Sequence, residues 1–231
     1  ALGFDTNGRQ LSISSPGEQG IKADIALKPR GESFEFSGEA RWPIELADNV
    51  SNREGGALAR GALLVEGKFA GEGRSPAAVL AALSGKGHYG LSDAALPRMT
   101  LDGFAGSVTN ANTPGALTTA LLKLAQAPGT VIGQHIGSFE ISGGEVEFSP
   151  VTPKIENLSV SLVPRVDLTS GDVTLATSIG LPSRAELPPV TMTYAGPPGD
   201  MAVRSGTSAL AAKLGYELLS KEMAELEKLQ Q

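Results

Sequence analysis

The chain has 231 residues, a formal net charge of −6 and no cysteine, and it contains 29 glycines and 15 prolines. The absence of cysteine excludes disulfides, thiolate catalysis and cysteine-ligated zinc. The scattered lysines and arginines form no basic stripe, so nucleic acid is not expected as a partner. The glycine content, without a G-X-Y period, indicates many turns and strand ends.

Most of the sequence alternates between apolar and polar residues with a period of two, which is typical of strands with one dry and one wet face. The alternation runs through residues 1–72 and again through 136–196, and glycines and prolines separate the runs at hairpin spacing. The polar stretch 46–56 is expected to be a long loop or a mobile edge. We therefore expect a mainly β protein, with curved antiparallel sheet(s) forming a U-shaped or sandwich-like trough.

Three helices are expected to interrupt the strands. In the first, over 75–83, Ser75 is the predicted N-cap and Pro76 the first helical residue. Thr113 and Pro114 repeat this pattern in the second, over 113–129, so residues 75–127 read as helix, strand, helix. The third covers 207–230 and is amphipathic. Its predicted apolar stripe consists of Leu210, Leu214, Leu218, Met223 and Leu226. All these segments belong to one predicted domain, 1–231.

The stretch Gly85-Lys86-Gly87 invites comparison with a nucleotide-binding loop. Such a loop needs a helix that begins directly after the glycines, whereas here a helix precedes them and a strand follows. The sequence therefore predicts no nucleotide cofactor. Gly85 is expected to end the helix in a left-handed cap, and Gly87 is expected to enter the next strand.

No catalytic or metal-binding group of residues is apparent. Ser84, His88 and Asp93 are crowded within ten residues, where strand alternation would not bring them to one oxyanion site. The only other histidine, His135, lies far away in the sequence, and the two histidines lack metal-ligand spacing. Glu145 and Glu147 share a strand face and are expected to be solvated. We therefore expect a protein that is not an enzyme and that has no cofactor and no metal site.

The apolar strand face is the remaining candidate site, and two interpretations of it are open. The face could be the packed core of a closed sandwich or barrel, or part of it could line a groove of lipid size, because alternation reports burial and not what covers the face. Nearly all of the candidate residues have a charged or hydroxyl residue next to them in the sequence. The predicted groove residues are Phe34, Phe36, Leu63, Val65, Phe69, Phe139, Ile141, Phe148, Val160 and Val173.

Three further stretches have a recognisable pattern. They are ARGALLVEGKFAGEGRSPAAVLAALSGKGHYGLSDAALPRMTLDGF (59–104), GSFEISGGEVEFS (137–149) and PVTMTYAGPPGDMAVRSGTSALAAKLGYELLSKEMAELEKLQ (189–230). They resemble the C-terminal region of the AsmA family of Gram-negative envelope proteins. The shared features are a short S-P helix, L-S-G-x-G leading into a strand, an F-x-I-x-x-G-x-V strand pair and a final amphipathic helix. The resemblance covers 58–231, while 1–57 is similar only in being rich in strands.

This resemblance implies a periplasmic domain, attached to the inner membrane by an anchor outside this fragment. It also implies a role in outer-membrane homeostasis and phospholipid transport, with a phospholipid or another acyl-chain ligand held in an apolar β groove. A second hypothesis stays open, in which the domain is a structural or assembly module of the cell envelope. Such a module would dock partner proteins through strand edges or the C-terminal helix without binding lipid.

Overall fold

The computed structural model describes residues 2–4, 10–14, 20–46, 57–96, 101, 103–110, 113, 115, 116, 119, 129–155 and 157–229. Within these residues, twelve strands pair antiparallel in chain order to form one sheet. The strands are β1 (Leu2–Phe4), β2 (Gln10–Ser14), β3 (Lys22–Arg30), β4 (Ser33–Glu45), β5 (Arg60–Gly73), β6 (Ser84–Leu96), β7 (Thr130–Ser142), β8 (Glu145–Phe148), β9 (Ser159–Asp167), β10 (Val173–Gly180), β11 (Val190–Gly196) and β12 (Ala202–Gly206). The mainly β, antiparallel prediction is confirmed.

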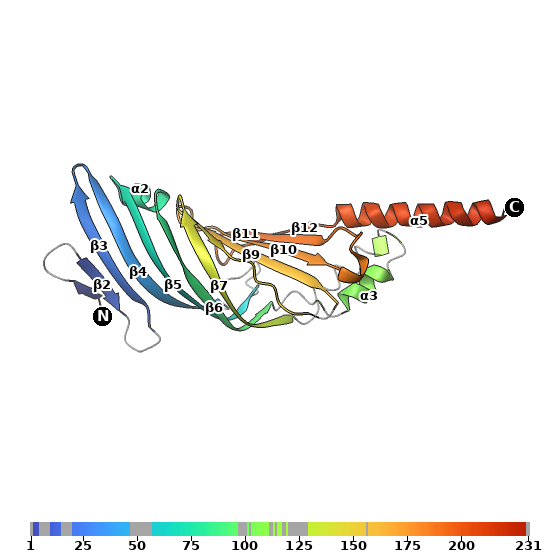
Figure 1. Ribbon diagram of the computed structural model, residues 1–231, viewed down its shortest axis with the longest axis horizontal. Coiled ribbons are helices and arrows are strands. Elements are labelled where there is room, and N and C mark those ends of the chain that lie inside the picture. The colour runs from blue at the N-terminus through green and yellow to red at the C-terminus, as the bar shows by residue number, and fades with distance from the viewer. Residues whose placement is uncertain are drawn as a thin grey trace.

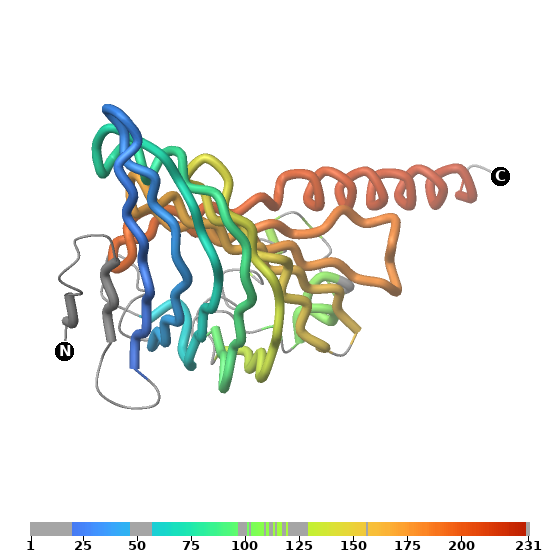
Figure 2. Tube along the Cα trace, turned by 60° about the vertical axis from the view of Figure 1, so that its left-hand side comes forward, coloured from blue at the N-terminus to red at the C-terminus, as the bar shows by residue number. Residues whose placement is uncertain are grey.

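The sheet is open and strongly twisted. In Figure 1 the strands run steeply at the β3–β4 end and almost horizontally at the β9–β12 end. Figure 2 shows β3 to β7 as one wall of the molecule, from which β9 to β12 turn away. The result is a curved trough, because each strand is rotated relative to its neighbour and the rotation accumulates along the sheet.

Short helical segments lie beside the sheet, and a long helix leaves it. They are α2 (Pro76–Ala81), α3 (Phe104–Thr109), the 3₁₀ turn η1 (Pro182–Arg184) and α5 (Ser208–Leu229). The predicted cap of α2 is confirmed, because the Ser75 hydroxyl accepts a hydrogen bond from the Ala78 amide at 3.2 Å. Thr113 likewise accepts from the Ala116 amide at 3.1 Å. Most of the predicted helix over 113–129, and most of the predicted loop over 46–56, lie outside the described residues.

The prediction that Gly85 caps the preceding helix is wrong. Helix α2 ends at Ala81 with Ala82 as its C-cap, and Gly85 already lies inside β6 without a positive φ. A Cβ atom at Gly85 would overlap the Lys68 carbonyl oxygen and lie 2.9 Å from the Phe69 Cα atom on β5. Glycine is needed at this position because the backbones of β5 and β6 approach each other closely, and not because the helix ends there in a left-handed conformation.

The hydrophobic core lies on one face of the sheet, over β6 to β11. Helices and connecting segments cover this part of the face. The covering residues include Leu101, Phe104, Val108, Val151, Leu210 and Leu214, all of which are buried in the same cluster as the strand residues. The first turns of α5 are therefore part of the core, whereas the rest of the helix extends past the sheet (Figure 1).

Candidate functional site

Strand register assigns every described strand residue to one of two faces. Phe36 pairs with Gly71, and Trp42 with Val65, which is in turn opposite Tyr89 on β6. Residues in register across an antiparallel sheet point to the same side. All ten predicted groove residues belong to this side, which we call the apolar face. The opposite side, which carries most of the charged strand residues, is called the polar face.

Four of the ten predicted residues are buried in the closed core. These four residues belong to the buried cluster, where other side chains of the protein cover them: Phe139, Ile141, Phe148 and Val160. The Phe139 and Phe148 ring centroids are 5.6 Å apart, and Tyr89 meets Phe148 edge to face at 5.3 Å. Tyr89 also donates a hydrogen bond from its hydroxyl to the Ser149 carbonyl at 2.8 Å. In this half of the apolar face, other parts of the protein cover the predicted side chains.

The other predicted residues lie where the apolar face is only partly covered. Phe36, Leu63, Val65, Phe69 and Val173 are half-buried against the core cluster, and 45% of Phe34 is exposed. Phe36 and Phe69 stack with their ring centroids 5.5 Å apart.

Neighbours that the prediction omitted extend the open area. Trp42 is 54% exposed and Leu27, which pairs with Phe36, is 42% exposed. Large apolar side chains thus remain exposed on β3 and β4, next to half-buried ones on β5.

Helix α2 borders this open area at one end. The helix backbone packs directly on two glycines of β5: a Cβ atom at Gly73 would lie 2.6 Å from the Val79 nitrogen, and one at Gly71 would lie 3.0 Å from the Val79 carbonyl oxygen. Those glycines pair with Phe34 and Phe36. The open apolar surface is therefore formed by the sheet, and helix α2 lies next to it near Phe34.

A groove of about 1280 Å³ crosses the sheet from β3 to β9, and it was not predicted from the sequence. Most of its lining side chains belong to the polar face. The charged ones are Lys22, Asp24, Glu39, Arg41, Glu66, Lys68, Lys86, Glu140, Glu147 and Arg165. Strand alternation placed these residues on the wet side, but it carries no information on how the strands bend.

The charges in this groove compensate one another. Arg41 Nε lies 2.6 Å from a Glu66 carboxylate oxygen, Lys68 Nζ lies 3.5 Å from Glu39, and Arg165 contacts Glu147 at 2.6 Å. The five basic and five acidic side chains in the lining sum to zero. Such exposed pairs contribute little energy and are screened by salt. The groove therefore presents a neutral, solvated surface with no concentrated charge for an ionic ligand.

The residues considered for catalysis do not form a constellation. Ser84 and His88 are four positions apart on β6, which separates them by about 13 Å along the strand. His135 lies beside Tyr89, with ring centroids 5.9 Å apart, on the face opposite to His88. Burial raises the pKa of Tyr194 to about 12 and also raises the pKa of Tyr89, so both phenols stay neutral within the core. Among the described residues, no group of three or more His, Asp or Glu side chains is placed to hold a metal ion.

Comparisons with protein-family models, curated proteins and solved structures find no match for this chain. None of the helices among the described residues combines the length and the apolar character that crossing a membrane requires.

Proposed function

We propose that the open part of the apolar face, over β3, β4 and β5, holds the acyl chain of a phospholipid or a related lipid. The observation that carries this proposal is the exposure of Phe34 and Leu27 beside the stacked pair Phe36 and Phe69, with Trp42 exposed further along the same face of β4. Single exposed apolar residues are ordinary on protein surfaces, but a contiguous group of large ones marks a surface that binds something apolar.

The chemistry of this surface suits an acyl chain. Burying a methylene group stabilises a complex by about 0.8 kcal/mol, so several carbons in contact with the sheet suffice without any specific polar ligand. The proposal involves no catalytic step and no cofactor. Its biological setting follows the AsmA resemblance: a periplasmic domain attached to the inner membrane through a segment outside this fragment, with a role in phospholipid transport and outer-membrane homeostasis.

The test uses paired substitutions on the two faces of the sheet. Phe34→Glu on β4 and Val65→Glu on β5 place a carboxylate on the open apolar surface. Ala70→Glu, the control, places a carboxylate on the exposed polar face of β5. Binding of a fluorescent phospholipid is expected to weaken at least about 10-fold in the first two variants, because an unpaired charge opposes burial of the chain. Ala70→Glu is expected to bind like the parent.

Thermal melts of the same proteins separate binding from folding. Phe34→Glu is expected to melt close to the parent because the side chain reaches water, whereas Ile141→Glu in the closed core is expected to lose the folded state. Mass spectrometry of an organic extract provides an independent readout of co-purified lipid. Parent protein that carries no lipid and binds none would contradict the proposal.

One observation favours the alternative of a structural or assembly module of the cell envelope. All five residues of β12 are exposed, and among the described residues no strand pairs with its outer edge. An unpaired edge can accept a strand from an envelope protein partner. A lipid-free protein that keeps its fold and captures an extended peptide along β12 would support this alternative.

A further inference from the structure

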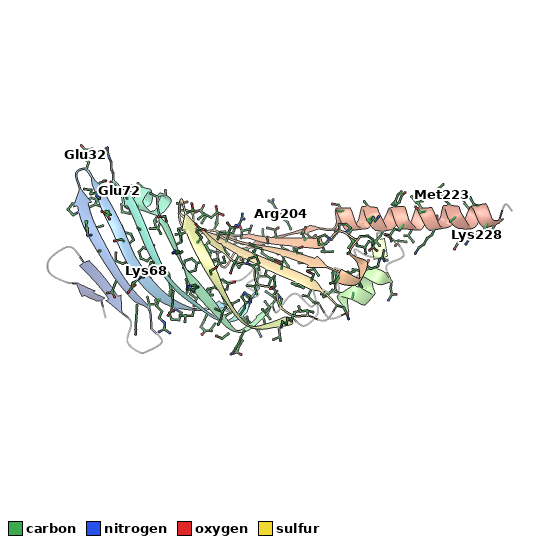
Figure 3. All side chains as sticks on the ribbon, in the orientation of Figure 1. Glu32, Lys68, Glu72, Arg204, Met223 and Lys228 are labelled. Carbon is green, nitrogen blue, oxygen red and sulfur yellow. The ribbon has the colours of Figure 1, made fainter. Side chains whose placement is uncertain are left out.

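Helix α5 has two apolar sides, of which one is buried and the other is exposed. Leu210 and Leu214 are buried in the core, and Arg184 of η1 holds the same part of the helix through a 2.7 Å contact between its Nη2 atom and a Glu217 carboxylate oxygen. From residue 219 onward every described residue is exposed. Figure 3 shows Met223 and Lys228 on the part of α5 that lies beyond the sheet.

The projecting part carries an apolar stripe of its own. Tyr216, Leu219, Met223 and Leu226 are each between 58% and 68% exposed, and their spacing of three, four and three residues places them on one side of the helix. We call these four residues the distal stripe. The 3–4 spacing over two turns and more is the pattern of a helix that pairs with another helix.

We infer that the distal stripe pairs with the distal stripe of a second copy of this chain, in antiparallel orientation. Centred on Lys221, such a pair would place Leu219 opposite Met223 and Tyr216 opposite Leu226 of the second copy. Helices pack in this way because apolar side chains at alternating spacings of three and four fit between those of the neighbour.

Charge complementarity favours this orientation. Beside the stripe, Lys213 would face Glu227 of the second copy, and symmetry gives this attractive pair twice. A parallel pair would instead place Glu222 next to Glu227 of the second copy, twice. The antiparallel arrangement has one like-charge contact, between the two Glu222 side chains at its centre, and solvent exposure keeps its cost small.

Gly215 provides an independent geometric argument. A glycine within a helix destabilises it relative to alanine. Apart from the helix's own backbone and the neighbouring residues, no described atom lies within 4 Å of a Cβ atom added at Gly215. In the antiparallel pair, Leu229 of the second copy would occupy that space. Leu229 is otherwise 83% exposed.

The charge of the projecting segment disfavours a membrane surface as the occupant. Residues 219–229 contain two lysines, Lys221 and Lys228, against three glutamates, Glu222, Glu225 and Glu227, which gives a net charge of −1. Helices that lie on anionic membranes are rich in Lys and Arg on their polar side. A paired helix fits the charge pattern better.

The test measures self-association of the whole chain by sedimentation velocity from about 1 to 300 µM, because a seam of two heptads is small compared with stable interfaces. The parent is expected to form dimers within this range, and Met223→Glu is expected to stay monomeric. Glu227→Lys should weaken dimerisation at least about 5-fold, and Lys213→Glu combined with Glu227→Lys should restore it. A parent that is monomeric throughout, or a dimer unaffected by Met223→Glu, would overturn the inference.

Site-specific cross-linking tests the orientation, since the chain has no cysteine of its own. Ser220→Cys flanks the stripe on the side where the antiparallel copies meet, so a short bis-maleimide should link two copies. The neighbouring Lys221→Cys points away from the seam and serves as the matched control. Equal cross-linking of both variants would overturn the antiparallel pairing. So would vesicle binding by a monomeric parent that Met223→Glu abolishes, because the stripe would then serve a membrane.

Discussion

Replacing Thr177 by valine is expected to stabilise the protein. Thr177 lies on the apolar face of β10, opposite Leu162 of β9 and Met192 of β11, and only 2% of it is exposed. Its hydroxyl oxygen is buried and has no hydrogen-bond partner among the residues that the structure describes. Valine keeps the branched shape of threonine and replaces this hydroxyl by a methyl group, so the core loses an unsatisfied polar atom and no packing volume.

The size of the effect follows from the cost of that atom. A buried polar group without a partner costs about 1–3 kcal/mol. We expect Thr177→Val to raise the free energy of unfolding by about 1–2 kcal/mol, measured by urea denaturation followed by circular dichroism. For a chain of this length the melting temperature should rise by about 2–8 °C.

Two further variants show whether the hydroxyl is the cause. Thr177→Ser keeps the hydroxyl and removes the methyl group, so it should destabilise the protein by about 1 kcal/mol. Thr174→Val changes a half-buried residue of the same strand on the polar face, and its effect should stay within about 0.5 kcal/mol. A Thr177→Val protein less stable than the parent would refute the reasoning, because the hydroxyl would then have a stabilising partner.

Two other predictions concern single core positions. The pKa of Tyr194 is raised to about 12 by burial, so its phenol ionises in the unfolded chain near pH 10 but stays neutral in the folded one. The free energy of unfolding of the parent should therefore fall by up to about 3 kcal/mol between pH 10 and 12, relative to that of Tyr194→Phe. Denaturant titrations in which the two proteins lose stability equally over this pH range would contradict the prediction. Gly87→Ala should destabilise the protein by about 2–3 kcal/mol, because the new Cβ atom would overlap a carbonyl oxygen of β5. Gly90→Ala, on the same strand with open space above it, should be close to neutral in the same melts, and equal effects of the two substitutions would show that the contact at Gly87 is unimportant.

Local sequence determined the strands and their faces. Alternation at period two survives in the structure because a pleated strand must send neighbouring side chains to opposite sides, whatever the tertiary fold. The same holds for the cap at Ser75, which depends on residues within one helical turn. Two elements lacked a local signal. Strand β12, with the sequence AVRSG, has only one large apolar residue. Helix α3 is only six residues long, and its Phe104 and Val108 side chains are buried in the core.

Tertiary structure decided what covers each part of the apolar face. Phe36 and Phe139 have the same alternation, yet one is half-open and the other is enclosed, because the described core segments from distant parts of the chain, such as α3 and the start of α5, pack in the cluster that buries Phe139. The predicted single stripe of α5 divides for the same reason. Leu210 and Leu214 are buried because the helix starts against the core, while Met223 and Leu226 are exposed because the helix continues past the edge of the molecule. Periodicity records which side of an element is apolar, and only the packing of distant segments determines whether protein, ligand or a second molecule covers it.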